Sequence, residues 1–151
     1  MNNFQDFISF MQDYTAFYEG LVDSQKDKLK AMLSHNLKKI DQSVCAQQAD
    51  AMKIESMESK RASLQQDAGF DGKTLQEIIS LVPGAEAEKL RELAKRINQA
   101  VAEIRYYNDK SIDVVKTNIQ AVNGAAEKLQ GYTAKKQTDS YNPTSIFETK
   151  I

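Results

Sequence analysis

The chain has 151 residues, of which 41% are hydrophobic and 27% are charged, and this composition is typical of a folded domain rather than a disordered chain. Its formal net charge of -1 argues against a nucleic-acid-binding protein, because such proteins need clustered lysine and arginine side chains against the phosphates. One cysteine, one histidine and no apolar run near the ~20 residues of a membrane span predict an intracellular protein without disulfides, metal or other cofactor.

The first part of the chain has apolar residues at helical spacing, and we expect a helix to begin near Phe4. The rhythm of three and four residues continues as far as Leu64 and passes Gly20, where the helix could kink or break. Gly69 and Gly72 tolerate the left-handed backbone of a helix C-cap and turn. The pattern therefore predicts one long helix that ends at Gly69.

A short helix is expected next, beginning at Thr74. Its hydroxyl can accept a hydrogen bond from the amide of Glu77, while the Glu77 side chain reaches back to the Thr74 amide, as in a capping box. Pro83 disfavours helical geometry in the residue before it, so this helix should end at Val82.

The segment from Glu86 to Gln130 carries the most regular apolar pattern in the chain. Sustained over about six heptads, this pattern predicts a third helix with coiled-coil-like packing and a polar middle that fixes register at a cost in stability. We expect it to pair with the first helix as an antiparallel hairpin, in a rod roughly 65 Å long. The residues that form this seam alternate four and three positions apart: Leu90, Ala94, Ile97, Val101, Ile104, Asn108, Ser111, Val115, Asn118, Val122, Ala125, Leu129 and Tyr132.

The composition changes after Gly131 to a polar segment without helical periodicity. We therefore divide the chain into a helical bundle domain, residues 1–131, and a flexible C-terminal tail, residues 132–151. The expected fold is all-α: an elongated antiparallel helical bundle or coiled-coil hairpin of two long helices, with a short connecting helix and the tail.

His35 is the only histidine, and its surroundings suggest one catalytic alternative. The run from Ser34 to Lys39 is similar to the phosphoacceptor motif of histidine phosphotransfer domains, which are also helical bundles. That motif has a glycine where this chain has Lys39, whose long side chain would obstruct a partner's active site. A solvated histidine is the competing interpretation.

Other catalytic patterns are weaker still. Nucleophilic catalysis needs a base and an orienting group beside the nucleophile, and one histidine and one cysteine are a poor basis for such a set. Glu55, Glu58 and Asp67 occur among basic residues at helical spacing, which is typical of a solvated charged face. We expect a protein that is not an enzyme.

Two groups of apolar residues leave alternatives open. Phe7, Phe10 and Phe17 lie beside the main stripe of the first helix, so they form either a broader core or a surface for self-association or partner binding. A second group is expected in the core by default, although its methionines would also suit an adaptable binding groove. This group consists of Ala51, Met52, Met57, Ile112, Ile119 and Val122.

A particular order of features extends over nearly the whole chain. Leucines precede a basic pair in the first long helix, a short helix follows and stops at a proline, and the third helix contains an asparagine before a tyrosine. In this order the chain resembles the FlgN family, the cytoplasmic export chaperones for the hook-associated proteins of bacterial flagella. The residues concerned are Leu29, Leu33, Lys60-Arg61, Leu64, Thr74-Leu75-Gln76-Glu77-Ile78-Ile79, Pro83, Leu90-Arg91-Glu92-Leu93, Asn108 and Tyr132.

The resemblance implies a function based on non-covalent binding. The protein would bind C-terminal helical segments of the hook-filament junction proteins, prevent their early assembly and deliver them to the flagellar type III export gate. An amphipathic substrate helix needs an apolar groove, so we expect contacts at Val115, Ile119, Val122 and Leu129. In the family the region after the last helix also takes part in binding, which adds Tyr132, Tyr141, Ile146 and Phe147.

The tail is where the chain departs from the family pattern, because Tyr132 is followed by Thr133 rather than soon by a glycine. Tyr132 could dock to the export gate instead of the substrate. A generic coiled-coil adaptor or oligomeric scaffold is the competing function, since a heptad seam also suits a homo-oligomer.

Overall fold

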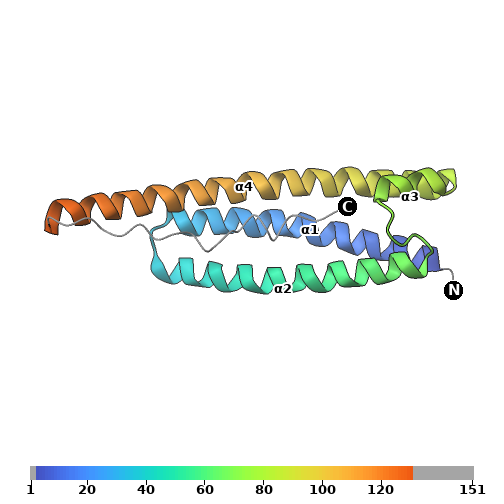
Figure 1. The fold of residues 1–151 in the computed structure, drawn as a ribbon, viewed down its shortest axis with the longest axis horizontal. Helices are drawn as coiled ribbons and strands as arrows, with labels where there is room; N and C mark the ends of the chain where they lie inside the picture. The colour runs from blue at the N-terminus through green and yellow to red at the C-terminus, as the bar shows by residue number, and fades with distance from the viewer. Residues whose placement is uncertain (1–2, 131–151) are drawn as a thin grey trace.

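A computed structural model describes residues 3–130, which form four helices. They are α1 (Asn3–Leu33), α2 (Leu37–Asp67), the short α3 (Leu75–Leu81) and α4 (Gly84–Gln130). The helices pack side by side as an elongated bundle, with α1 between α2 and α4 (Figure 1). The all-α bundle expected from the sequence is confirmed. Within the described range, no helix is both long and apolar enough to cross a membrane.

The prediction of one long first helix is wrong, because the chain reverses at the turn Ser34–Asn36. His35 adopts a left-handed backbone with φ 54°, which stops α1 and turns the chain. Asn36 then caps α2, since its side-chain oxygen accepts a hydrogen bond from the amide of Lys39 at 3.2 Å. Gly20, the other position at which the helix could break, lies inside α1. The first long segment is therefore an antiparallel pair of helices.

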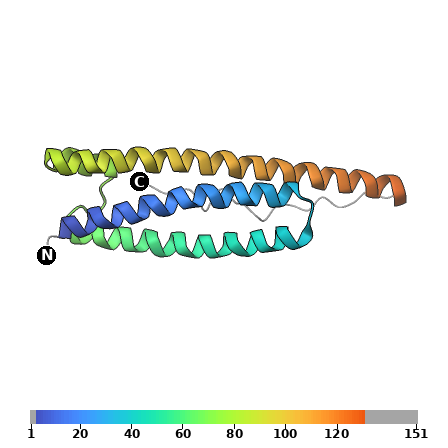
Figure 2. The same ribbon diagram turned by 180° about the vertical axis from the view of Figure 1, so that it is seen from behind.

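The predicted antiparallel pairing of the first and third helices is also wrong: α4 runs parallel to α1. Three hydrogen bonds show the direction, because Gln5 bonds to Glu86, Glu19 to Arg96 and Lys28 to Asn108 in ascending order along both helices. The reason is topological. α2 returns the chain to the N-terminal end of α1, so α4 has to begin there, as both views show (Figures 1 and 2).

The aromatic residues of α1 form the centre of the core. Phe7, Tyr14 and Tyr18 are almost completely buried, and the rings of Tyr14 and Tyr18 lie 4.9 Å apart between centroids. Phe10 is buried as well, while Phe17 is half-buried and has the ammonium of Lys53 over its ring. These positions confirm the broader core as the role of these rings. The seam of α4 from Leu90 to Ile104 covers the same core from the other side.

Several predicted helix ends are confirmed. Gly69 and Gly72 have positive φ values of 87° and 74°, which an L side chain would adopt only with strain. The Thr74 side chain accepts a hydrogen bond from the amide of Glu77 at 3.2 Å and so caps α3. Val82 is extended ahead of Pro83, as expected of a residue before proline.

α4 continues well beyond the other helices. The pair Lys28–Asn108 is 80 residues apart, and the same offset places the end of α1, Leu33, level with Asp113. The remaining stretch, Asp113–Gln130, projects past the α1–α2 turn (Figure 1). This stretch, called the extension below, is roughly 26 Å long.

Candidate partner-binding surface

Four of the predicted contact residues lie on the extension, and the structure leaves their side chains open to solvent. The exposed fraction is 38% at Val115, 41% at Ile119, 67% at Val122 and 84% at Leu129. The default assignment of Ile119 and Val122 to the core is therefore wrong. Neither α1 nor α2 reaches this part of α4, so the apolar seam continues where its packing partners have ended. Tyr132, Tyr141, Ile146 and Phe147 lie outside the described residues.

α2 also presents apolar side chains to solvent near the turn. Leu37 is 79% exposed, and Val44 is 43% exposed although it continues the line of α2 residues that face α1. Met52, expected in the core, is exposed as well, because it lies off that line. The end of the bundle that contains the α1–α2 turn and α4 from Asn108 onward, called the distal end below, is therefore rich in unburied apolar surface.

A cavity of about 320 Å³ opens at the distal end, between α1 and α2. Met32 of α1 and Val44 and Ala51 of α2 give it apolar walls, while Lys28 and Gln47 contribute polar side chains. A mostly apolar hollow with a few polar groups is typical of a binding site for an amphipathic ligand.

A buried polar layer lies beside this cavity. The Lys28 ammonium donates to Oδ1 of Asn108 at 2.6 Å, and the Gln25 side-chain amide donates to Oε1 of Gln47 at 2.8 Å. Ser111 is buried one turn further along α4 and bonds back to the carbonyl oxygen of Tyr107. The predicted polar middle of the third helix is thus buried at Asn108 and Ser111, whereas Asn118, on the extension, is half-buried.

The polar layer is not fully satisfied. Oε1 of Gln25 and Nδ2 of Asn108 are buried without a hydrogen-bond partner in the part of the chain that the structure describes. Lys28 is only 5% exposed, and its burial lowers the pKa of the ammonium to about 8. Sequence reasoning missed Lys28. The available signal was its spacing, because it follows Phe7, Tyr14 and Leu21 at intervals of seven.

Comparison with protein families identifies the family of the chain. Residues 1–145 match the family model described as FlgN protein. The chain belongs to the FlgN family. Neither the curated proteins nor the solved structures give a match. FlgN proteins are chaperones of flagellar export, so the chain is a flagellar export chaperone, and the resemblance seen in the sequence is confirmed.

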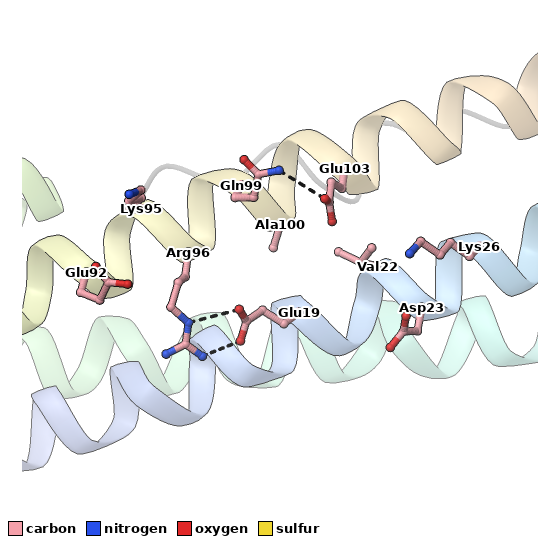
Figure 3. Close-up of a pocket in the computed structure, with 10 residues that line it drawn as sticks. All are labelled: Glu19, Val22, Asp23, Lys26, Glu92, Lys95, Arg96, Gln99, Ala100 and Glu103. Carbon is pink, nitrogen blue, oxygen red and sulfur yellow. Dashed lines mark hydrogen bonds and ion pairs between the residues drawn. The ribbon is translucent and has the colours of Figure 1, made fainter.

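A second groove of this FlgN protein lies between α1 and α4 and has a volume of about 390 Å³ (Figure 3). Its walls carry carboxylates and cations together, and Arg96 forms an ion pair with Glu19 across it at 2.5 Å. Mixed charge of this kind is typical of a solvated face rather than a selective site.

A further polar cluster holds α2 against the core. The Tyr14 hydroxyl donates to Glu58 at 2.8 Å, and Arg61 also bonds to Glu58. Burial alone would raise the pKa of Glu58, but the hydrogen bonds from Arg61 and Tyr14 outweigh it and lower this pKa. Burial, together with Tyr18 and Glu58, raises the pKa of Tyr14 far above its ordinary value. Glu58 therefore belongs to a packed network and not to the solvated face that was expected.

His35 of this FlgN protein is exposed in the α1–α2 turn, where its backbone is left-handed. Lys39 lies at the start of α2 and is exposed as well. Within residues 3–130, no group of three or more histidine, cysteine, aspartate or glutamate side chains could hold a metal ion. His35 is therefore a residue of the helix reversal, and its side chain is open to solvent.

Proposed function

We propose that this chaperone binds C-terminal helical segments of hook-associated proteins at its distal end, prevents their early assembly and delivers them to the export gate. It acts in the cytoplasm, by non-covalent contacts and without catalysis. The observation that supports this proposal is the extension of α4, which projects beyond α1 and α2 and whose apolar side chains are exposed to solvent.

The chemistry of the extension suits a helical partner. Val115, Ile119 and Val122 are spaced four and three residues apart, so they follow one stripe of α4. A helix that lays its own apolar stripe against them would bury both surfaces, as in helix-in-groove recognition. The tail residues Tyr132, Tyr141, Ile146 and Phe147 are further candidates for contact, with Tyr132 also a candidate for the export gate.

The test is calorimetric titration with peptides that cover the C-terminal segments of hook-associated proteins. Replacing Val122 and Leu129 by alanine should weaken binding at least 10-fold, because two exposed apolar anchors would lose contact area. Leu81→Ala is the matched control, since Leu81 is 59% exposed on α3 at the other end of the bundle. A chain ending at Gly131 measures the contribution of the tail.

The outcomes separate the alternatives. Unchanged affinity in the Val122→Ala, Leu129→Ala variant, with helicity intact, would exclude the extension as the contact surface. If no peptide binds the unmodified chain, the assignment of hook-associated proteins as its partners fails, and a scaffold for other partners becomes the better account.

A further inference from the structure

The polar layer of the distal end has more hydrogen-bond donors than acceptors. The Lys28 ammonium has three N–H groups, and the structure provides it with one side-chain acceptor, Oδ1 of Asn108. Nδ2 of the same Asn108 is a second buried donor and has no partner among the described residues. A ligand that accepts hydrogen bonds would add an acceptor for the Lys28 ammonium, whereas Oε1 of Gln25 needs a donor.

The positive charge of Lys28 is also uncompensated. The ion pairs found in residues 3–130 join Arg61 to Glu58, Arg91 to Glu88 and Arg96 to Glu19, and none includes Lys28. A buried cation without a counter-ion is rare in proteins, because transfer of an unpaired charge out of water is strongly unfavourable. The expected ligand is therefore an anion rather than a neutral acceptor.

The cavity gives this cation a route to a partner. Lys28 lines it together with Met32 and Val44, so an incoming side chain would meet apolar walls around one charged residue. Val44 is partly exposed at this opening, and Val115 begins the exposed stripe of the extension only a few residues after Asn108. A helix lying along the extension could therefore place a side chain near the polar layer.

We propose that the cavity takes an aspartate or glutamate side chain of the bound export substrate, whose carboxylate accepts a hydrogen bond from Lys28, the charged residue of the cavity wall. This inference rests on the proposed function and adds a rule of selection to it. The chaperone prefers amphipathic helices that carry an acidic residue next to their apolar stripe. The apolar residues supply contact area, and the carboxylate fixes the register of the helix along the extension.

The experiment compares two sets of variants by calorimetry at neutral pH. The first set consists of two single variants of the chaperone. Lys28→Met keeps the length of the side chain and removes its charge, and Lys30→Met is the control. Lys30 is an exposed lysine of the same helix, so its substitution changes the net charge equally. The other set is a C-terminal peptide of a hook-associated protein in which each aspartate or glutamate is replaced singly by asparagine or glutamine.

Lys28→Met should weaken binding of the parent peptide at least 10-fold, and Lys30→Met should change it less than 3-fold. One acid-to-amide peptide should bind the unmodified chaperone more weakly by a similar factor, yet bind the Lys28→Met variant no more weakly than the parent peptide does. This non-additivity identifies the pair. Circular dichroism tests whether each variant is folded. If the Lys28→Met variant is unfolded, Lys28→Gln takes its place.

Two results would overturn the inference while leaving the proposed function intact. The first is unchanged affinity for the parent peptide after substitution of Lys28. The second is a peptide series in which every acid-to-amide change has the same effect on the unmodified and substituted chaperone. If the unmodified chaperone binds no peptide, the proposed function and this inference fail together.

Discussion

Lys28 gives the free chaperone a pH dependence whose sign follows from its burial. The pKa of the ammonium falls from its ordinary value of 10.5 to about 8 in the folded chain. Between these values the unfolded chain holds more protons, so the free energy of unfolding rises with pH. Burying the charged ammonium destabilises the folded chain. This destabilisation is present in full below the folded pKa and decreases as the pH approaches the unfolded pKa. Urea denaturation should show a rise of about 2 kcal/mol from about pH 7 to about pH 9.5.

Lys28→Met is the control for this rise, because the variant has no group that titrates at that site. The same rise in the variant would show that other groups cause it. The range stops below about pH 10, since tyrosine in the unfolded chain ionises there and the raised pKa of Tyr14 then has the opposite effect.

A substitution at Gly20 tests whether the first helix is continuous at this residue or bends there. The structure places it inside α1, on the exposed side, where an added methyl group would meet no neighbouring group within 4 Å. Gly20→Ala should therefore raise the free energy of unfolding by about 0.5 to 1 kcal/mol through helix propensity alone. Thermal or urea denaturation measures this change. A loss of stability would mean that the chain bends at Gly20.

The helix reversal at His35 shows where sequence reasoning failed. Apolar periodicity continues from Leu33 to Leu37 across the turn, and the turn contains neither glycine nor proline. The left-handed backbone of His35 therefore had no obvious marker. Ser34 and Asn36, two residues that favour caps and turns, were the available signals. Once this turn was missed, the parallel direction of α4 was missed with it.

At the scale of the elements, caps and seams were more predictable than exposure. The cap by the Thr74 side chain and the positive φ of Gly69 depend on local chemistry, so both could be predicted from the sequence. The seam of α4 was recognised as well, yet its buried part ends near Ser111 and its exposed part begins at Val115. That boundary depends on where α1 ends in space. A pattern within one helix carries no information about the length of its neighbour.

α2 should be the least stable of the three long helices. Its only buried residues are Gln47, Ile54 and Gln65, whereas α1 buries a series of large aromatic and aliphatic side chains. Hydrogen exchange should therefore show amides of α2 exchanging at a lower opening free energy than those of the first two-thirds of α1 and of α4 up to Ile104. Equal protection of all three helices would show that they open only together.

A matched pair of variants tests the cause of this difference. Tyr14→Phe removes the hydroxyl that bonds to Glu58 and keeps the ring, so it should speed exchange in α2 more than in α4. Arg91→Ala disrupts only the exposed pair with Glu88 on α4 and should leave α2 unchanged. Faster exchange in α2 after Tyr14→Phe but not after Arg91→Ala would show that the hydrogen bond from Tyr14 to Glu58 helps to hold α2 against the core.

For the whole molecule, α4 sets the length. Its 47 residues extend over roughly 70 Å. The shape can be tested through the radius of gyration, which is about 15 Å for a compact domain of this chain length. A uniform rod as long as α4 has a radius of gyration of about 20 Å. Small-angle X-ray scattering of a chain ending at Gly131 should give a radius of gyration close to the rod value, well above that of a compact domain, and independent of protein concentration.

The concentration series matters because the exposed stripe of the extension could also join two copies. Pairing through Val115, Ile119 and Val122 would place two rods end to end, and the longest dimension would then increase with concentration. A substrate helix has the opposite effect on shape, since it lies beside the extension and adds mass along an existing rod. Adding a peptide that binds should therefore raise the forward scattering while leaving the longest dimension nearly unchanged. A large increase in length would place the peptide beyond the end of α4 and not along it.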